Sequence, residues 1–487
     1  MERLNAWNTY DLAMQNDCMD FAKDYMDFLN AGKTERECGD FFVAEAEKKG
    51  YIELSRAMAE KKQLKAGDCV YSVWMNKSMV LFRIGEKPFE EGINILGAHI
   101  DSPRLDVKQN PVYEDGGFCY LDTHYYGGIK KYQYVTLPLA IHGVVVKKSG
   151  ETVIINVGEE EDDPVFFISD LLPHLAQDQM KKNAATFIDG EALDLVIGNK
   201  PVTIDADTKP VKKGDSAEKA EDKEENKAGK EGVTKALLRI LKDEFGIEEE
   251  DFISAELEIV PAGKARDAGF DRSMVLAYGQ DDRVCAYPSF RAQMEVTDIA
   301  RTSCTLLVDK EEIGSVGATG MQSRFFENAL AEVMQLCGQY SEIAMRRTLA
   351  NSAMLSSDVS AAFDPSYAAA FEKKNACLMG GGMVFNKFTG SRGKSGSNDA
   401  NAEYIGALRK VMDDDEVIYQ TAELGKVDLG GGGTIAYILA LYGMNVIDSG
   451  VPVLSMHAPW EATSKADIYE AFRGYKAFLR KMDFRNA

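Results

Sequence analysis

Histidine, aspartate and glutamate recur in five segments of this 487-residue chain, where they could hold a metal ion or move a proton. In the first segment, Gly97–Pro103, His99 and Asp101 directly follow an apolar stretch. A histidine and an aspartate two residues apart on an extended segment point the same way, so the carboxylate can hold an imidazole that binds a metal. Taken alone, this motif is more typical of a capped turn with a hydrogen-bonded histidine.

Two further segments carry adjacent carboxylates. The apolar run Leu306–Val308 leads to Glu311 and Glu312. Adjacent glutamates cannot both face one way on a strand, so one can bind a cation while the other faces the substrate as a base. Asp281 and Asp282 stand where an apolar run meets a predicted helix, and a carboxylate at such a turn suits a position between two ions. In isolation, an acidic loop and a helix cap are the simpler interpretations of these two segments.

The remaining two segments each supply one residue of metal-ligand type. Asp358 follows the short run Leu355–Ser357, and His457 follows a strand pattern that starts at Val446. Either pattern alone favours a helix cap or a structural histidine. Together, the five segments deliver two histidines, two aspartates and one glutamate, which suit a pair of zinc-like ions that share a carboxylate. Such a pair polarises a carbonyl and activates water at neutral pH. Glu311 is left without a ligand role.

The elements that must position these residues alternate between helices and strands. Helices are expected at 11–29, 36–49, 235–245, 326–337 and 465–482, and strands at 69–74, 79–84, 93–98, 305–308 and 446–455. Glycine, aromatic and β-branched residues concentrate between Val112 and Val157, which predicts strands and hairpins there. The alternation predicts an α/β fold with a mostly parallel sheet that is covered by helices on both faces.

Composition excludes several classes of protein. The chain has 56 Lys and Arg against 78 Asp and Glu, and its net charge of −22 disfavours nucleic acid and anionic membranes as partners. Its longest apolar stretches, such as Thr434–Leu441, are far shorter than the roughly 20 residues of a membrane span. The 8 cysteines form no C-x-x-C pair, so a cysteine zinc cage is not expected. Free thiols and the lack of an apolar run after Arg3 favour a cytoplasmic protein.

One long segment is expected to lie outside any packed core. Residues 205–234 contain no aromatic residue, and valine is their only large apolar residue type. Such a segment cannot bury enough apolar surface to offset the entropy lost on ordering. We therefore expect a solvated, mobile loop that a short Gly/Ser linker can replace without loss of folding or turnover.

The motifs, in this order, resemble those of the aspartyl aminopeptidase and vacuolar aminopeptidase I family of dinuclear zinc exopeptidases. The most specific stretches are GAHIDSPRLDVK (97–108), DKEEIGS (309–315), SSDVSAAFDPSY (356–367) and VPVLSMHAPWE (451–461). The resemblance spans nearly the whole chain. It implies a zinc-exopeptidase-like catalytic domain, formed by residues 1–108 and 263–487, which is interrupted by a β-rich dimerisation domain at 109–262. It also implies dimers that assemble into a tetrahedral dodecamer.

The resemblance further implies a role for each candidate residue. One divalent ion would be held by His99, Asp281 and Asp358. The other would be held by Asp281, Glu312 and His457. Both ions are expected to be zinc, with Glu311 as the general base and Asp101 as the partner of His99. The implied activity is hydrolysis of N-terminal residues from peptides by a water that two metal ions activate.

The chain departs from the family in three segments that bear on specificity. Residues 126–134 lack the tryptophans and the Asp-Arg-Asp of the family segment, and Asp178 stands where the family often has a histidine that reaches a neighbouring subunit. The family segment GPVIK-x-N, whose lysine suits an acidic side chain, is replaced by a segment that contains Asn386. We therefore expect neutral or apolar N-terminal residues to be accepted at least as well as Asp and Glu.

Two other functions are compatible with the same motifs. A deacylase on the same zinc scaffold would release an acyl group and would not need a free amine. An inactive binding protein that keeps the fold and forms a shell is the alternative outside the enzymes. The complete ligand set and Glu311 argue against the inactive protein, which has no chemical reason to retain a base.

Overall fold

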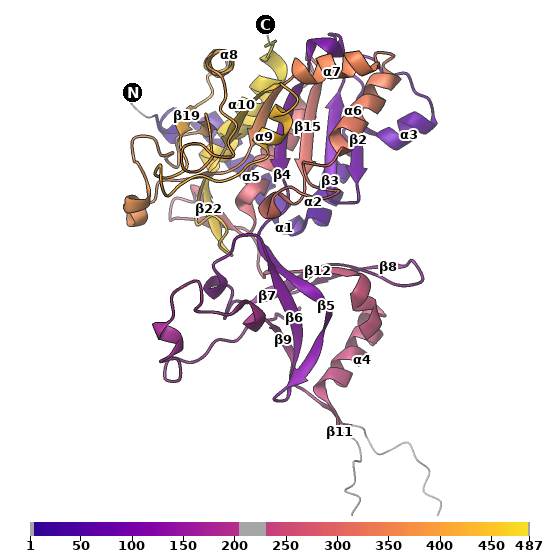
Figure 1. The fold of residues 1–487 in the computed structure, drawn as a ribbon, viewed down its shortest axis with the longest axis vertical. Helices are drawn as coiled ribbons and strands as arrows, with labels where there is room; N and C mark the ends of the chain where they lie inside the picture. The colour runs from indigo at the N-terminus through magenta and orange to yellow at the C-terminus, as the bar shows by residue number, and fades with distance from the viewer. Residues whose placement is uncertain (1–3, 204–229, 486–487) are drawn as a thin grey trace, which may run out of the picture. The chain divides into compact units, whose positions relative to one another are not determined.

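The computed structural model describes residues 4–203 and 230–485, which form two compact units (Figure 1). Unit 1 contains the chain up to Pro103, the short return Tyr126–Ile129 and the chain from Gly263 onward. Unit 2 contains Arg104–Tyr125 and Lys130–Ala262. Most of the expected loop at 205–234 lies outside the described residues. Its last residues belong to regular structure, because a strand covers 230–231 and a helix starts at Val233.

Unit 1 is built around a nine-stranded sheet with the order β1-β2-β3-β15-β4-β16-β20-β18-β19. Its strands are β1 (Ile52–Glu53), β2 (Cys69–Trp74), β3 (Ser78–Arg83), β4 (Asn94–His99), β15 (Ser303–Val308), β16 (Ala353–Ser357), β18 (Met383–Asn386), β19 (Tyr419–Ala422) and β20 (Asn445–Gly450). The central strands β15, β4, β16 and β20 are all parallel to their neighbours within this group. The mostly parallel sheet predicted from the sequence is therefore confirmed.

Helices cover both faces of this sheet. Successive residues of a strand point to opposite faces, so each strand contributes side chains to both cores. Leu96 and Ala98 pack into one core, whereas Ile95 packs into the other. The first core includes α1 (Leu12–Ala31), α2 (Glu35–Lys48), α5 (Gln280–Glu295), α8 (Ala402–Asp414) and α10 (Lys465–Lys481). The second includes α3 (Leu54–Ala59), α6 (Phe325–Leu336), α7 (Glu342–Ala350) and α9 (Ala436–Ala440). The result is a three-layer α/β architecture, as expected.

A second sheet of unit 1 has the order β13-β14-β22-β21-β17. Its strands are β13 (Arg266–Ala268), β14 (Met274–Ala277), β17 (Ser360–Ala361), β21 (Pro452–Leu454) and β22 (Glu461–Ser464). The prediction of a single strand at 446–455 was wrong, because β20 ends at Gly450 and β21 belongs to this second sheet. Pro452 has no amide hydrogen to donate, so the ladder of a central strand cannot continue through it.

Unit 2 contains a six-stranded sheet with the order β8-β7-β12-β5-β6-β9. Its strands are β5 (Arg104–Asp115), β6 (Phe118–Tyr126), β7 (Leu139–Val146), β8 (Thr152–Val157), β9 (Leu195–Gly198) and β12 (Ala255–Pro261). β7 pairs antiparallel with both β8 and β12. Helix α4 (Val233–Phe245) lines an apolar cavity of about 740 Å³ together with residues of the sheet, such as Ile141 and Leu257. The strand β10 (Val202–Thr203) pairs with β11 (Lys230–Glu231).

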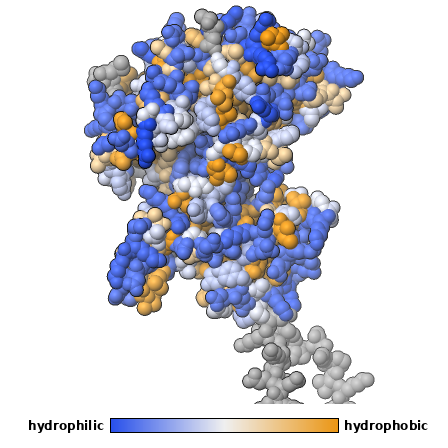
Figure 2. Space-filling view, viewed as in Figure 1, coloured by the Kyte–Doolittle hydropathy of each residue, from blue (hydrophilic) through white to orange (hydrophobic). Residues whose placement is uncertain are grey.

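The drawn face of the protein is mainly hydrophilic, and its apolar residues form separate small patches (Figure 2). Among residues 4–203 and 230–485, no helix combines the length and the apolar character that a membrane crossing requires. All eight cysteines, from Cys18 to Cys377, are free thiols.

Candidate metal centre

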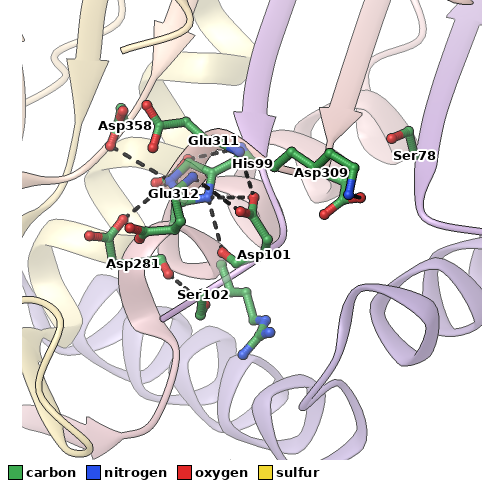
Figure 3. Close-up of polar contacts among 12 residues, drawn as sticks. Ser78, His99, Asp101, Ser102, Asp281, Asp309, Glu311, Glu312 and Asp358 are labelled. Carbon is green, nitrogen blue, oxygen red and sulfur yellow. Dashed lines mark hydrogen bonds and ion pairs between the residues drawn. The ribbon is translucent and has the colours of Figure 1, made fainter. Parts of the chain in front are cut away.

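The predicted site residues lie together in unit 1, and Figure 3 labels all of them except His457. Most of them follow the ends of sheet strands. His99 ends β4, and Asp101 lies two residues beyond it. Glu311 and Glu312 lie on a short 3-10 helix, η7 (Glu311–Ile313), which follows β15, and Asp358 follows β16. Because β15, β4 and β16 are parallel neighbours, their carboxyl ends meet at one edge of the sheet.

Asp281 and His457 reach the same place from the second sheet. Asp281 lies in the first turn of α5, the helix that follows β14, and the Ser102 hydroxyl donates a hydrogen bond of 2.6 Å to the main-chain oxygen of Asp281. His457 lies in the connection between β21 and β22. Both segments are therefore anchored by strands, as the sequence pattern predicted for Asp281.

The carboxylate of Asp281 lies between the two histidines. Its Oδ1 is 3.3 Å from Nε2 of His99, and its Oδ2 is 3.2 Å from Nε2 of His457. Nε2 of His457 is also 3.6 Å from Oε1 of Glu312. Nε2 of His99 is 4.0 Å from Oδ1 of Asp358. The two oxygens of one aspartate thus face two different groups of ligand-type atoms.

Hydrogen bonds to main-chain carbonyls orient both imidazoles. Nδ1 of His99 lies 3.0 Å from the carbonyl oxygen of Asp101, and Nδ1 of His457 lies 2.8 Å from that of Gly128. A carbonyl oxygen only accepts, so Nδ1 carries a proton in both rings and Nε2 faces the carboxylates. This is the arrangement by which metal-binding histidines are usually held.

The residues fit a zinc-type cation by spacing and by chemistry. Ligand atoms of a tetrahedral zinc with bonds of about 2.0–2.1 Å lie about 3.3 Å apart, which matches the separations of 3.2–3.6 Å around Asp281. Ligand atoms of His99, Asp281 and Glu312 lie within 4.8 Å of one another, as do those of His99, Glu311 and Asp358. Oε1 of Glu312 is buried and has no hydrogen-bond partner among the residues that the structure describes.

Charge in the site is strongly unbalanced. Burial, with repulsion from Asp281, raises the pKa of Glu311 to about 7. Burial and neighbouring carboxylates also raise the pKa values of Glu312 and Asp358 well above their usual range. For Asp281, hydrogen bonds from His457 and His99 outweigh the effect of burial and hold its pKa well below the usual range. A bound cation would relieve the repulsion among these carboxylates.

Asp101 contacts other residues of the site in addition to its predicted partner, His99. Its Oδ1 accepts a hydrogen bond of 3.1 Å from the main-chain nitrogen of Glu311, and its Oδ2 accepts one of 3.1 Å from that of Glu312. Oδ1 is also 3.3 Å from Nδ1 of His99. The Tyr126 hydroxyl donates to Oδ2 at 2.9 Å. The fully buried Asp101 therefore fixes the turn that carries both glutamates.

Three residues that contact the site were given no role in the prediction from sequence, although Asp282 was noted beside Asp281. Tyr126 holds Asp101, and Oδ2 of Asp282 accepts a hydrogen bond of 3.3 Å from the main-chain nitrogen of His99. Glu461 accepts hydrogen bonds from the main-chain nitrogens of Asp281 and His457. Glu461 ends the motif VPVLSMHAPWE, and its acidic side chain at the end of an otherwise apolar stretch was the available signal.

Comparisons with known proteins identify relatives of this chain. The family described as aminopeptidase I zinc metalloprotease (M18) matches residues 28–479. The chain is 55% identical over 478 residues to the protein named Probable M18 family aminopeptidase 1 of Clostridium acetobutylicum, and the match covers 98% of each chain. A crystal structure of an M18 aminopeptidase from Thermotoga maritima superposes with a TM-score of 0.89 at 39% identity, covering 99% of this chain and 100% of that one. The structure of an S. cerevisiae mApe1 dodecamer shares the fold, with a TM-score of 0.71 at 20% identity over 94% of this chain and 96% of that one. The chain belongs to the M18 family of aminopeptidase I zinc metalloproteases.

Proposed function

We propose that this metalloaminopeptidase removes N-terminal residues from peptides with two divalent ions, which are zinc. Three residues would hold one ion: His99, Asp281 and Asp358. Three would hold the other: Asp281, Glu312 and His457. The observation that carries this proposal is the carboxylate of Asp281, which directs one oxygen toward each histidine at 3.2–3.3 Å.

Glu311 is the proposed general base. Two zinc ions bound in the site would polarise the scissile carbonyl and make a water acidic enough to attack at neutral pH. The carboxylate of Glu311 lies among the ligand atoms of His99 and Asp358, where it can take the proton of the attacking water and return it to the leaving amine. Nearby cations would favour its ionised form, so it would be ready to accept a proton at neutral pH.

Asp101 is proposed to position the reacting groups. It holds the main chain of both glutamates and lies beside Nδ1 of His99. It thereby holds the base Glu311 and the proposed ligands Glu312 and His99 in fixed positions relative to one another. Its carboxylate is fully buried and already accepts these hydrogen bonds, so it does not act on substrate directly.

A substrate panel tests the proposed reaction against the two alternatives. We expect aminoacyl anilides with a free amine to be cleaved, N-acetylated versions to resist cleavage, and activity to vanish on dialysis against a chelator and to return with Zn2+. Cleavage of acylated and free-amine substrates at similar rates would favour the deacylase. A protein that holds two ions and cleaves neither would be the inactive binding protein.

Neutral N-terminal residues are expected to be good substrates. Asn386, which replaces the lysine of the family segment, is buried, and Lys387 and Lys394 nearby in the sequence both form ion pairs with Asp399. A substrate carboxylate buried without a cation costs several kcal/mol. We therefore expect kcat/KM for Leu and Ala substrates to equal or exceed that for Asp and Glu. An acidic preference of about tenfold, roughly 1.4 kcal/mol, would contradict this expectation.

Self-association is part of the proposal. We propose that the inserted domain, residues 109–262, joins two chains and that the dimers form a tetrahedral dodecamer in the cytoplasm. The sequence resemblance supports this assembly, and one structural neighbour is described as a dodecamer. Unit 2 also exposes several large apolar side chains, such as Ile154, Leu175 and Met180. The free thiols support the reducing compartment.

A further inference from the structure

Glu461 joins the main chains of two candidate metal ligands that lie far apart in the sequence. It is the first residue of β22, its side chain is buried, and it pairs with Ala277 at the end of β14. Its Oε1 accepts a hydrogen bond of 2.7 Å from the main-chain nitrogen of His457. Its Oε2 accepts one of 3.0 Å from the main-chain nitrogen of Asp281. One carboxylate therefore fixes the distance between two segments that each carry a candidate ligand.

The main chain of Glu461 is itself held in place. The Gln280 side chain donates a hydrogen bond of 2.6 Å to the carbonyl oxygen of Glu461, and its other described acceptor is the carbonyl of Val275 in β14. The side chain of Glu461 thus projects from a fixed strand, and it can act as a reference point for Asp281 and His457.

His457 needs such support because its backbone is strained. Its φ angle is +65°, in the left-handed region that residues with a Cβ rarely adopt, and Ser455 two residues earlier has a φ of +59°. Two hydrogen bonds pin His457 in this conformation: Glu461 at the main-chain nitrogen and Gly128 at Nδ1 of the ring. Without the bond to Glu461, the backbone is free to relax, and the ring would turn Nε2 away from Asp281.

We infer that Glu461 is a positioning residue that sets the affinity of one metal position, the one formed by Asp281, Glu312 and His457. This inference rests on the proposed ligand assignment. Glu461 acts through main-chain nitrogens, so it does not contribute a ligand atom. The other metal position should depend less on Glu461, because it shares only Asp281 with the first, and neither His99 nor Asp358 is among the described hydrogen-bond partners of the Glu461 carboxylate.

The inference is tested with a pair of matched variants, E461Q and D467N. Asp467 on α10 is equally buried and accepts two main-chain hydrogen bonds, of 2.8 Å from Gly380 and 2.7 Å from Gly382, and none of the candidate ligands is among its described hydrogen-bond partners. Both substitutions replace a buried carboxyl group with an amide and put an NH2 opposite a main-chain N–H. They therefore carry similar costs for folding, and only E461Q should alter the metal site.

Metal-free wild-type protein and both variants are titrated with Zn2+ by calorimetry and with Co2+ by visible absorption. We expect wild-type protein and D467N to bind two equivalents alike. We expect E461Q to bind one equivalent about 10- to 100-fold more weakly, the range typical of groups that orient metal ligands, and to show an altered Co2+ spectrum for that equivalent alone. E461D, which keeps the carboxyl group but is too short to reach both nitrogens, should weaken the same equivalent by a smaller factor.

Two results would overturn the inference. One is an E461Q titration that matches wild-type protein. The other is equal weakening in E461Q and D467N, which would indicate general loosening of the fold. If E461Q does not fold, the E461D titration decides on the same criteria. Wild-type protein that binds no divalent ion would instead overturn the proposed function, so the two failures are distinguishable.

Discussion

Glu311→Gln is expected to lower kcat by about 10²- to 10⁴-fold, with nearly unchanged zinc content and KM. Glutamine keeps the size of the side chain and can still occupy the turn that Asp101 holds at the main chain of Glu311. It cannot take a proton from the attacking water, so only the proton-transfer step is lost. Steady-state kinetics on the zinc-loaded protein measure kcat, and metal analysis of the same sample measures zinc content.

The neighbouring glutamate provides the control for this prediction. Glu312→Gln lies on the same short helix and has the same change in shape and charge, but Oε1 of Glu312 faces His457 at 3.6 Å. We expect this variant to lose metal affinity, and its activity should recover in part at high zinc concentration. Wild-type turnover in Glu311→Gln, or a loss of zinc equal to that in Glu312→Gln, would rule out the assignment of Glu311 as the base.

Asp281→Asn is expected to weaken both metal positions at once and to lower activity at least as far as Glu311→Gln. The reason is that Oδ1 of Asp281 faces His99 and Oδ2 faces His457, so the substitution removes one oxygen and the negative charge that both ions would share. Titration of the metal-free variant with zinc measures this effect as a loss of affinity for both equivalents.

Variants of two other aspartates show whether the effect of Asp281→Asn is that of a ligand shared by both ions. Asp358→Asn should weaken only one equivalent, because Oδ1 of Asp358 lies near His99, at 4.0 Å from Nε2. Asp271→Asn should change neither, because Asp271 is exposed and accepts hydrogen bonds from Ser273 in a surface turn. Two tight equivalents in Asp281→Asn would show that this residue is not shared.

The sequence predicted the elements whose signals are local. The strand at 69–74 and the helix at 465–482 appear within one residue of their expected bounds, because the periodic apolar residues within them determine them. The prediction of a single strand at 446–455 was wrong because the two halves of this segment pair with strands of different sheets. That choice depends on Pro452 and on partner strands, and a continuous apolar pattern does not reveal it.

The candidate ligands could be located from sequence because each follows an apolar strand and has a side chain of ligand type. Their supports could be located only in part: Asp101 was predicted as the partner of His99, but its hydrogen bonds to the main chain of Glu311 and Glu312 were not. Glu461 and Asp101 accept hydrogen bonds from main-chain nitrogens. Almost every residue type presents the same N–H, so the sequence of the partner residues does not indicate these contacts. Tyr126 reaches Asp101 from a segment that returns to unit 1 for only four residues, Tyr126–Ile129. Such contacts become visible only once the fold is known.

The central claim is that two metal ions share Asp281, and anomalous diffraction above and below the zinc absorption edge tests it most directly. Crystals of the zinc-loaded protein should show two anomalous peaks per chain, about 3.5–4 Å apart. We predict one peak between His99 and Asp358 and the other between Glu312 and His457, each within bonding distance of one oxygen of Asp281. A single peak, or two peaks of which only one contacts Asp281, would contradict the account.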